Sequence, residues 1–419
     1  MNAKPTCSLI LSALLLAASA SMGYENYDPY EDEPYSDRLT GDWGGYRSKL
    51  VDEGVEVFAY FNAIYAGNVS GGLEKTSDFA SDSFFGAEFD LEKLIGWEDT
   101  EFVVSGIYRQ GDDLTEAIGS QYSVMQLVGG QTIFLYNVTL EKLFRDGDIS
   151  VKGGRMTATD DFVGSPYYGY SLNNAVNGQI RAVLFDGVMT SYPYAVWGGR
   201  VRVNLPQDSK VQVGVFQLSP DMFDPDKHGV DLNIGSDDGV SIFTQYDWTP
   251  ELAGKPFRFY AGVNQTFGYD IDEFNSDSTT DAFTRFYMGT DYQVYREREE
   301  SDEGLVLLAT FAYTAQQEVA IVPIQSSVGA NYKGLLPGRP DDQAVLFFTY
   351  GQFSDDYSDQ LVAAGGASVD NEMVLETGYR VAITDYIYAQ PDVQYIINPG
   401  GTGDIDNAVV LGVQFGARF

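Results

Sequence analysis

The sequence has almost none of the side chains from which enzymes most often build an active site. Its 419 residues include one cysteine and one histidine. The cysteine, Cys7, lies in an N-terminal segment that we expect to be removed, so no disulfide is expected. The histidine, His228, stands alone in an acidic stretch, which leaves little for a Ser-His-Asp triad or a histidine-rich metal site. We therefore expect no catalytic residue, no metal and no cofactor.

Positive charge is also scarce. The chain has 25 Lys and Arg against 61 Asp and Glu, which gives a net charge of −36 at pH 7. Such a chain repels nucleic acid and anionic lipid surfaces, so no nucleic-acid partner is expected. The acidic residues gather between the predicted strands, for example at 221–226 and 354–359. They are solvated loop residues or, alternatively, they attract cations to the mouth of a pore.

The sequence lacks any run of about 20 apolar residues that could cross a bilayer as a helix. A shorter apolar run over 9–18 follows Lys4 and leads into the small residues Ala18-Ser19-Ala20. This order is typical of a secretory signal peptide, which we assign to residues 1–20. The chain is therefore expected to be exported.

The clearest positive signal is an alternation of apolar with polar or small residues over 409–419. A period of two residues predicts a β-strand with one apolar face. A strand that ends the chain on an aromatic residue, Phe419, suits a lipid-facing strand of an outer-membrane barrel. An edge strand of a soluble sandwich would show the same pattern. Aromatic residues make up 14 % of the chain, which suits the aromatic girdles of a barrel and also large soluble β-proteins.

The same alternation predicts sixteen strands within residues 55–419, each near the length that a tilted strand needs to cross a bilayer. An even number returns both ends to the periplasm, and short and long connections alternate as turns and outer loops do in such barrels. The predicted fold class is all-β, a transmembrane antiparallel β-barrel with a short N-terminal periplasmic helix. The predicted strands are 55–67, 83–92, 100–109, 132–142, 148–156, 195–205, 210–218, 240–248, 257–267, 284–294, 305–314, 324–333, 344–353, 373–383, 386–397 and 408–419.

Residues 21–54 precede the predicted barrel. They begin as an acidic lead-in with prolines, a composition that does not favour regular structure. Tyr46, Leu50 and Val51 then fall on one helical face, and Gly54 suits the end of a helix. We predict one short helix directly before the first strand.

The sequence resembles the OprB-type carbohydrate-selective porins of Gram-negative outer membranes. The segments that carry the resemblance are 39–45 with Arg47 and Leu50, 191–193 with Trp197-Gly198, 334–342, and 390–401. They span nearly the whole chain beyond the predicted signal peptide. The resemblance implies a monomeric or homotrimeric barrel of 16 strands in the outer membrane that passes sugars by diffusion. It also places arginines of the pore constriction in the segments that contain Arg109 and Arg155.

A passive pore needs a constriction whose lining attracts the solute weakly. The longest predicted loop, 157–194, is the one most able to fold inward. It carries acidic, amide, aromatic and guanidinium groups that suit sugar hydroxyls and sugar faces, although it could equally be a loop packed on itself by its tyrosines. Its candidate pore-lining residues are Asp160, Asp161, Tyr168 and Arg181.

Further candidates lie on the predicted strands. In 195–205, Arg200 has the parity of the lumen and Trp197 the parity of the lipid. Arg109 and Arg155, opposed to Asp160, Asp161 or Glu141, would set a transverse field across the pore. Arg155 has the parity of the outward residue Val151, so pointing inward would require a bulge or a strand end there. The alternative for either arginine is a salt bridge in the wall.

Three functions remain open on these observations. The first is an outer-membrane porin for sugars, whose partners are small sugars, membrane lipids and the barrel-assembly machinery that reads the C-terminal strand. The second is a cation-preferring porin with no sugar site, which the net charge favours. The third is a plugged structural or adhesive barrel, which would conduct no current.

Overall fold

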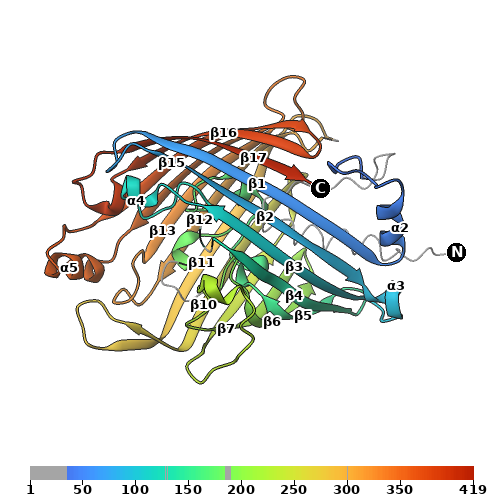
Figure 1. Cartoon of the computed structure of the whole chain (residues 1–419), viewed down its shortest axis with the longest axis horizontal. Helices are drawn as coiled ribbons and strands as arrows, with labels where there is room; N and C mark the ends of the chain where they lie inside the picture. The colour runs from blue at the N-terminus through green and yellow to red at the C-terminus, as the bar shows by residue number, and fades with distance from the viewer. Residues whose placement is uncertain (1–34, 128, 130, 185–189, 300) are drawn as a thin grey trace.

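The computed structural model describes residues 35–127, 129, 131–184, 190–299 and 301–419. The predicted signal peptide, 1–20, and most of the acidic lead-in lie outside the described residues. Within them, sixteen strands of eight or more residues form one closed antiparallel sheet, because β1 pairs with both β2 and β17. Figure 1 shows this barrel from the side, with α2 and the end of β17 at the same end. This end is the periplasmic one expected from an even number of strands.

Among the described residues, the helices are short and lie either directly before the first strand or in the connections between strands. The strands are β1 Val55–Ser70, β2 Ser77–Asp90, β3 Thr100–Gly111, β4 Ile133–Phe144, β5 Ile149–Met156, β6 Val196–Leu205, β7 Ser209–Leu218, β8 Gly239–Trp248, β9 Glu251–Leu252, β10 Lys255–Asp272, β11 Thr279–Arg296, β12 Gly304–Thr314, β13 Ile324–Lys333, β14 Gln343–Gln352, β15 Asn371–Thr384, β16 Ile387–Ile397 and β17 Ala408–Arg418. The α-helices are α2 Tyr46–Asp52, α3 Leu91–Ile95, α4 Thr115–Ile118 and α5 Asp355–Ala363, and the 3₁₀ helices are η1 Ala158–Asp160, η2 Pro166–Tyr170, η3 Arg181–Val183, η4 Pro225–Lys227 and η5 Pro399–Gly401.

The predicted strands correspond one to one with the long strands of the barrel, and the short helix α2 is confirmed. The strict alternation of short and long connections is wrong at two outer loops. The predicted loops 68–82 and 268–283 shrink to the connections 71–76 and 273–278, because the flanking strands continue beyond their predicted ends. Polar residues at those strand ends hid the continuation, since they lie above the part of the wall where apolar residues are required.

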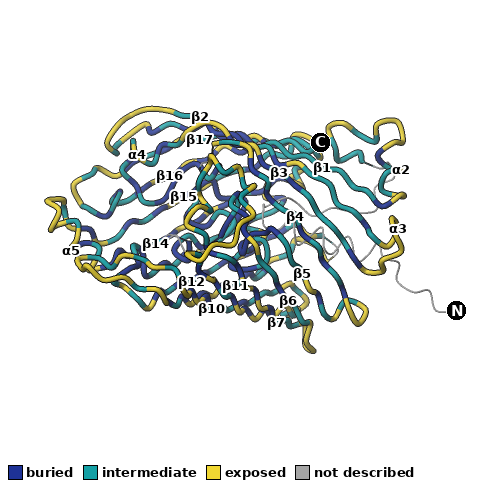
Figure 2. Tube along the Cα trace, turned by 60° about the horizontal axis from the view of Figure 1, so that its bottom comes forward, coloured by how far each residue is buried: buried dark blue, intermediate teal, exposed yellow. Residues whose placement is uncertain are grey.

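The two faces of the wall separate by parity as predicted. On β17, Leu411 and Phe415 are each 48 % exposed on the outside, whereas Gln414 is buried inside. On β6, Trp197 is exposed and Arg200 is buried. Figure 2 shows buried residues gathered in the middle of the barrel and exposed residues mainly at its two ends. Among the described residues, no helix is long and apolar enough to cross a membrane.

The N-terminal segment is attached beside the seam where the barrel closes. The backbone N–H of Leu39 donates to the carbonyl of Arg418 at 2.8 Å, and the guanidinium of Arg418 lies 2.9 Å from the carboxylate of Asp37. Arg47 of α2 is buried with its guanidinium 4.3 Å from the ring centre of Trp43. The first two contacts hold residues 37–39 against the last strand, β17, at the periplasmic end.

Candidate functional site

Two outer connections fold into the barrel rather than over its mouth. We call them inner loop A (the described residues of 112–132) and inner loop B (the described residues of 157–195). Figure 1 shows the short green helices of inner loop B within the outline of the barrel and α4 of inner loop A near its outer end. The apolar side chains of both loops pack on lumen-facing wall residues such as Ile64 and Val374, in clusters that are buried from solvent. Inner loop B was predicted to fold inward. Inner loop A was not predicted to do so, although its apolar residues between Leu114 and Leu127 were a signal for it.

The two inner loops are joined to each other by backbone hydrogen bonds. The N–H of Gln126 donates to the carbonyl of Leu172 at 2.9 Å, and the N–H of Asn174 donates to the carbonyl of Ser123 at 2.8 Å. The side chain of Asn174 accepts in return from the N–H of Ser123 at 2.9 Å. The loops therefore form one ordered body inside the lumen.

Two buried glutamates on β15 attach this body to the wall. Glu372 accepts from the backbone N–H groups of Gln121 and Tyr122 in inner loop A, at 2.8 and 3.0 Å. Glu376 accepts from the backbone N–H groups of Leu172 and Asn173 in inner loop B, at 2.5 and 3.3 Å. Both glutamates have almost no exposed surface. Their carboxyl oxygens accept from backbone donors that would otherwise be buried without a partner.

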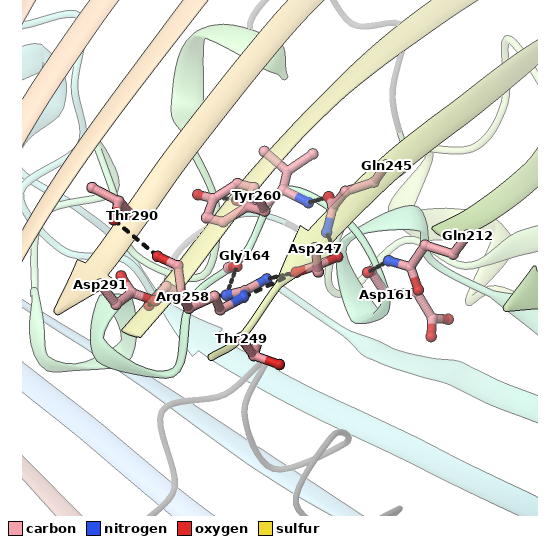
Figure 3. Close-up of polar contacts among 12 residues, drawn as sticks. Asp161, Gly164, Gln212, Gln245, Asp247, Thr249, Arg258, Tyr260, Thr290 and Asp291 are labelled. Carbon is pink, nitrogen blue, oxygen red and sulfur yellow. Dashed lines mark hydrogen bonds and ion pairs between the residues drawn. The ribbon is translucent and has the colours of Figure 1, made fainter. Parts of the chain in front are cut away.

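Side chains from other wall strands also form hydrogen bonds with the backbone of inner loop B. Figure 3 shows one such place, where Arg258 of β10 donates to the carbonyl of Gly164 and pairs with Asp247 of β8. The Arg258–Asp247 distance is 2.7 Å, and Asp291 of β11 lies 3.7 Å from the same guanidinium. Further contacts to the loop backbone come from Gln212 to Asp161, Gln245 to Val163, Arg380 to Gly169, Gln390 to Tyr170, and Gln325 to Ala175 and Ala182.

Arg200 is the centre of a buried charge network on β4, β5 and β6. Its guanidinium lies 3.0 Å from Asp161 of inner loop B and 3.1 Å from Glu141 of β4. Lys152 and Arg202 each lie 3.6 Å from one of these carboxylates. Burial alone would raise the pKa of Asp161, but the positive charges of Arg200 and Lys152 outweigh it and hold that pKa well below its usual range. The structure thus brings together three predicted site residues, Arg200, Asp161 and Glu141.

Arg109 belongs to a second network. It is buried, its Nε lies 3.0 Å from the carboxylate of Asp82 on β2, and its guanidinium stacks on the ring of Tyr192 at 4.6 Å. Tyr192 also donates to Asp82. Arg109 thus forms a salt bridge between neighbouring wall strands, which was the alternative for this residue, and its partner Asp82 was not singled out from the sequence. The opposition of Arg109 to Asp160, Asp161 or Glu141 across the pore stays a prediction.

Asp160 lies close to both networks but has its own partner. Its carboxylate accepts a hydrogen bond from the hydroxyl of Tyr136. Burial raises the pKa of Asp160, whereas neighbouring cations lower that of Asp161. Two adjacent carboxylates of inner loop B thus have opposite environments.

The remaining predicted site residues lie elsewhere. Tyr168 is buried, and its hydroxyl lies 2.7 Å from that of Tyr260 on the wall. Burial lowers the pKa of Arg181, in η3, to about 10. Arg155 is in register with the outward residue Trp197 and donates to the carbonyls of Ala195 and Asp231. Because cross-strand neighbours share a face, Arg155 does not join the networks of Arg109 and Arg200.

The comparisons with known proteins agree on one family. The family model described as carbohydrate-selective porin, OprB family, matches residues 75–419. Porin B of Pseudomonas aeruginosa is 26 % identical over 99 % of this chain and 97 % of its own length. The high-pH structure of Pseudomonas putida OprB has a TM-score of 0.87 at 26 % identity and covers 94 % of this chain and 100 % of that one. Its low-pH structure, with a TM-score of 0.61 and 22 % identity over 93 % of this chain and 100 % of that one, shows the same fold.

Proposed function

Because the chain belongs to the carbohydrate-selective porins of the OprB family and is an outer-membrane porin, we propose that sugars diffuse through the lumen past inner loop B. The observation that carries this proposal is the attachment of the loop to wall strands by polar side chains, with charged groups beside it. A constriction of this kind offers hydroxyl groups many donors and acceptors without a deep binding pocket.

The residues proposed to touch the sugar are the charged groups that keep contact with solvent. The side chains of Lys152, Arg202 and Arg258 are 16 %, 16 % and 22 % exposed, whereas those of Arg109 and Arg200 are 4 % and 1 % exposed. Guanidinium and ammonium groups can donate to several hydroxyl oxygens at once. In this proposal Arg109 and Arg200 position the constriction, and the three more exposed cations contact the solute.

Sugar flux into vesicles tests the proposal. Lipid vesicles that contain the purified protein should take up glucose or maltose. In the double variant Lys152→Gln and Arg202→Gln, the relative uptake rates of neutral sugars should change more than the ionic conductance does. As a matched control, Lys227→Gln removes an exposed cation from the outer loop between β7 and β8. Vesicles that admit no sugar would refute the proposed cargo, while unchanged rates in the double variant would remove these two residues from the sugar path.

A cation-preferring porin is the second candidate, and a specific feature favours it. Glu56 and Glu88 lie directly opposite each other on β1 and β2, and Glu101 lies on the neighbouring strand. Among the described residues, no ion pair within 4.0 Å is found for any of the three. Such a row attracts cations when its carboxyl groups are ionised. A reversal potential on the cation side under a salt gradient, together with no block by sugars, would favour this candidate over the first.

Assembly is also part of the proposal. We infer that the barrel-assembly machinery recognises the strand that ends in Phe419. We also infer that residues 1–20 are removed and that the porin then works among membrane lipids as a monomer or a homotrimer. The alternating pattern of β17 supports the first point, because its outward residues are apolar up to the chain end. Deletion of Phe419 should lower the amount of folded protein in the outer membrane, and sedimentation in detergent should give the subunit number.

A further inference from the structure

The outer loop between β7 and β8 crosses the outside of the barrel instead of standing above it. We call its residues 228–234 the outer flap. Three consecutive flap carbonyls accept hydrogen bonds from outward side chains of three neighbouring strands. These are Asp231 from Arg155 of β5 at 2.8 Å, Leu232 from the indole of Trp197 of β6 at 3.0 Å, and Asn233 from Gln217 of β7 at 2.9 Å.

The outer flap lies where the wall is shortest. β5 has eight residues, against 18 in β10. Eight residues at ~3.4 Å each and a tilt of ~40° give a height of about 21 Å, less than the ~25 Å apolar band of such barrels. β4 continues past the last residue of β5, since its pairing with β5 begins only at Val138. The edge of β4 beyond that point needs another partner.

The outer flap supplies that partner. The N–H of Leu135 on β4 donates to the carbonyl of His228 at 2.9 Å, and Nδ1 of His228 lies 3.0 Å from the carbonyl of Ile133. Gly229 permits this approach, because its φ is +68° and a Cβ there would lie 2.4 Å from the carbonyl oxygen of Leu135. The flap thus continues the wall where β5 ends.

The flap also covers polar groups that would be costly next to lipid. Arg155 and Gln217 have outward parity, and an arginine on the lipid face destabilises a barrel by up to a few kcal/mol. Their donors point to flap carbonyls instead. The flap then presents its own aliphatic side chains outward, with Val230 59 %, Leu232 52 % and Ile234 75 % exposed.

We propose that the outer flap is a lipid-contacting surface whose aliphatic side chains lie against the acyl chains of the membrane. The patch is continuous with the apolar outer wall, where Ile133 and Val215 are also exposed. A second copy of the chain fits less well. Exposed aspartates such as Asp226 and Asp237 flank the flap, and another copy with a net charge of −36 would bring like charges together.

Site-directed fluorescence tests the proposal on the full-length porin. Leu232→Cys and Ile234→Cys, each in a Cys7→Ser background, carry a bimane label in phosphatidylcholine vesicles with or without nitroxide-bearing acyl chains. Ser236→Cys, two residues beyond the flap and exposed, is the matched control. Unchanged single-channel conductance and heat-modifiable migration of each variant show that the barrel is folded.

The expected result is loss of emission at 232 and 234 with nitroxide lipids and weak quenching there by aqueous iodide, with the reverse at 236. Labels at 232 and 234 that behave like the label at 236 would overturn the proposal. Labels shielded from both quenchers, with cross-linking between copies at 232, would also overturn it and would assign the surface to a second copy.

Discussion

The attachment of inner loop B to Glu376 makes a sharp prediction about pore behaviour. Replacing Glu376 by methionine keeps the length of the side chain but removes Oε1, the one oxygen that accepts from the N–H groups of both Leu172 and Asn173. The wall blocks outward movement of the loop, so a released loop can only move toward the pore axis. Glu376→Met should therefore lower the mean current and add brief closures, rather than widen the channel.

The size of the effect follows from the two backbone donors that lose their acceptor. Each buried unpaired N–H costs about 1–3 kcal/mol, so the attached position of the loop loses about 2–6 kcal/mol. Even the lower value shifts the balance between attached and released loop by about 30-fold. Water in the lumen can satisfy the donors once the loop moves, which favours the released position.

Single-channel recording with a matched control measures this effect. Glu376→Gln keeps one acceptor oxygen for the two N–H groups. In the parent protein the hydroxyl of Ser171 lies within hydrogen-bond distance of the second carboxyl oxygen and of the carbonyl of Asn173. In the variant this hydroxyl can donate to the carbonyl of Asn173 and accept from the new amide group. The current of this variant should therefore stay close to that of the parent protein. If Glu376→Met folds into a barrel and its current traces match those of Glu376→Gln, the argument that this residue holds the constriction is refuted.

Three further predictions concern the charge networks. Arg109→Gln should move the reversal potential under a salt gradient toward cations, whereas Arg155→Gln should leave it unchanged because Arg155 faces outward. Arg200→Gln should lower the stability by about 3–5 kcal/mol, since it breaks a buried ion-pair network, and thermal unfolding measures this. The lowered pKa of Asp161 means that its stabilising contribution is present above the ordinary value of about 3.9 and is lost as the pH falls through the lowered pKa. The difference in unfolding temperature between the parent and Asp161→Asn should therefore persist at pH 5 and shrink at strongly acidic pH.

Most strands of the wall could be predicted from the sequence because each strand is recognisable from its own residues alone. Each strand has one face toward lipid and one toward the lumen, so the period of two repeats in every strand. Two features were beyond this reasoning. β1, β2, β10 and β11 extend past the apolar part of the wall, where their residues no longer need to alternate, and β9 has only two residues.

The candidate site was less predictable because its contacts join residues far apart in the chain. The parity of Arg109 and Arg200 indicated the lumen, and both are inside. The partner of Arg109 depends on the register of β2 against β3, which places Asp82 directly opposite it. Glu376 holds inner loop B from about 200 residues away, and no spacing in the sequence relates the two.

For Arg155, two lines of sequence reasoning disagreed. Its outward parity was visible in the sequence, but the resemblance to the family favoured the pore. The structure agrees with the parity, and the outer flap explains how an arginine can be accommodated on that face.

The central claim is that sugars pass the constriction formed by inner loop B and its charged neighbours. The most direct test is the single-channel current of the purified porin in a planar bilayer, titrated with glucose, maltose and sucrose. The account predicts a steady current that falls saturably as one of these sugars is added. A steady current that no sugar alters would contradict it and favour the cation-preferring porin, and the absence of any current would contradict an open pore altogether.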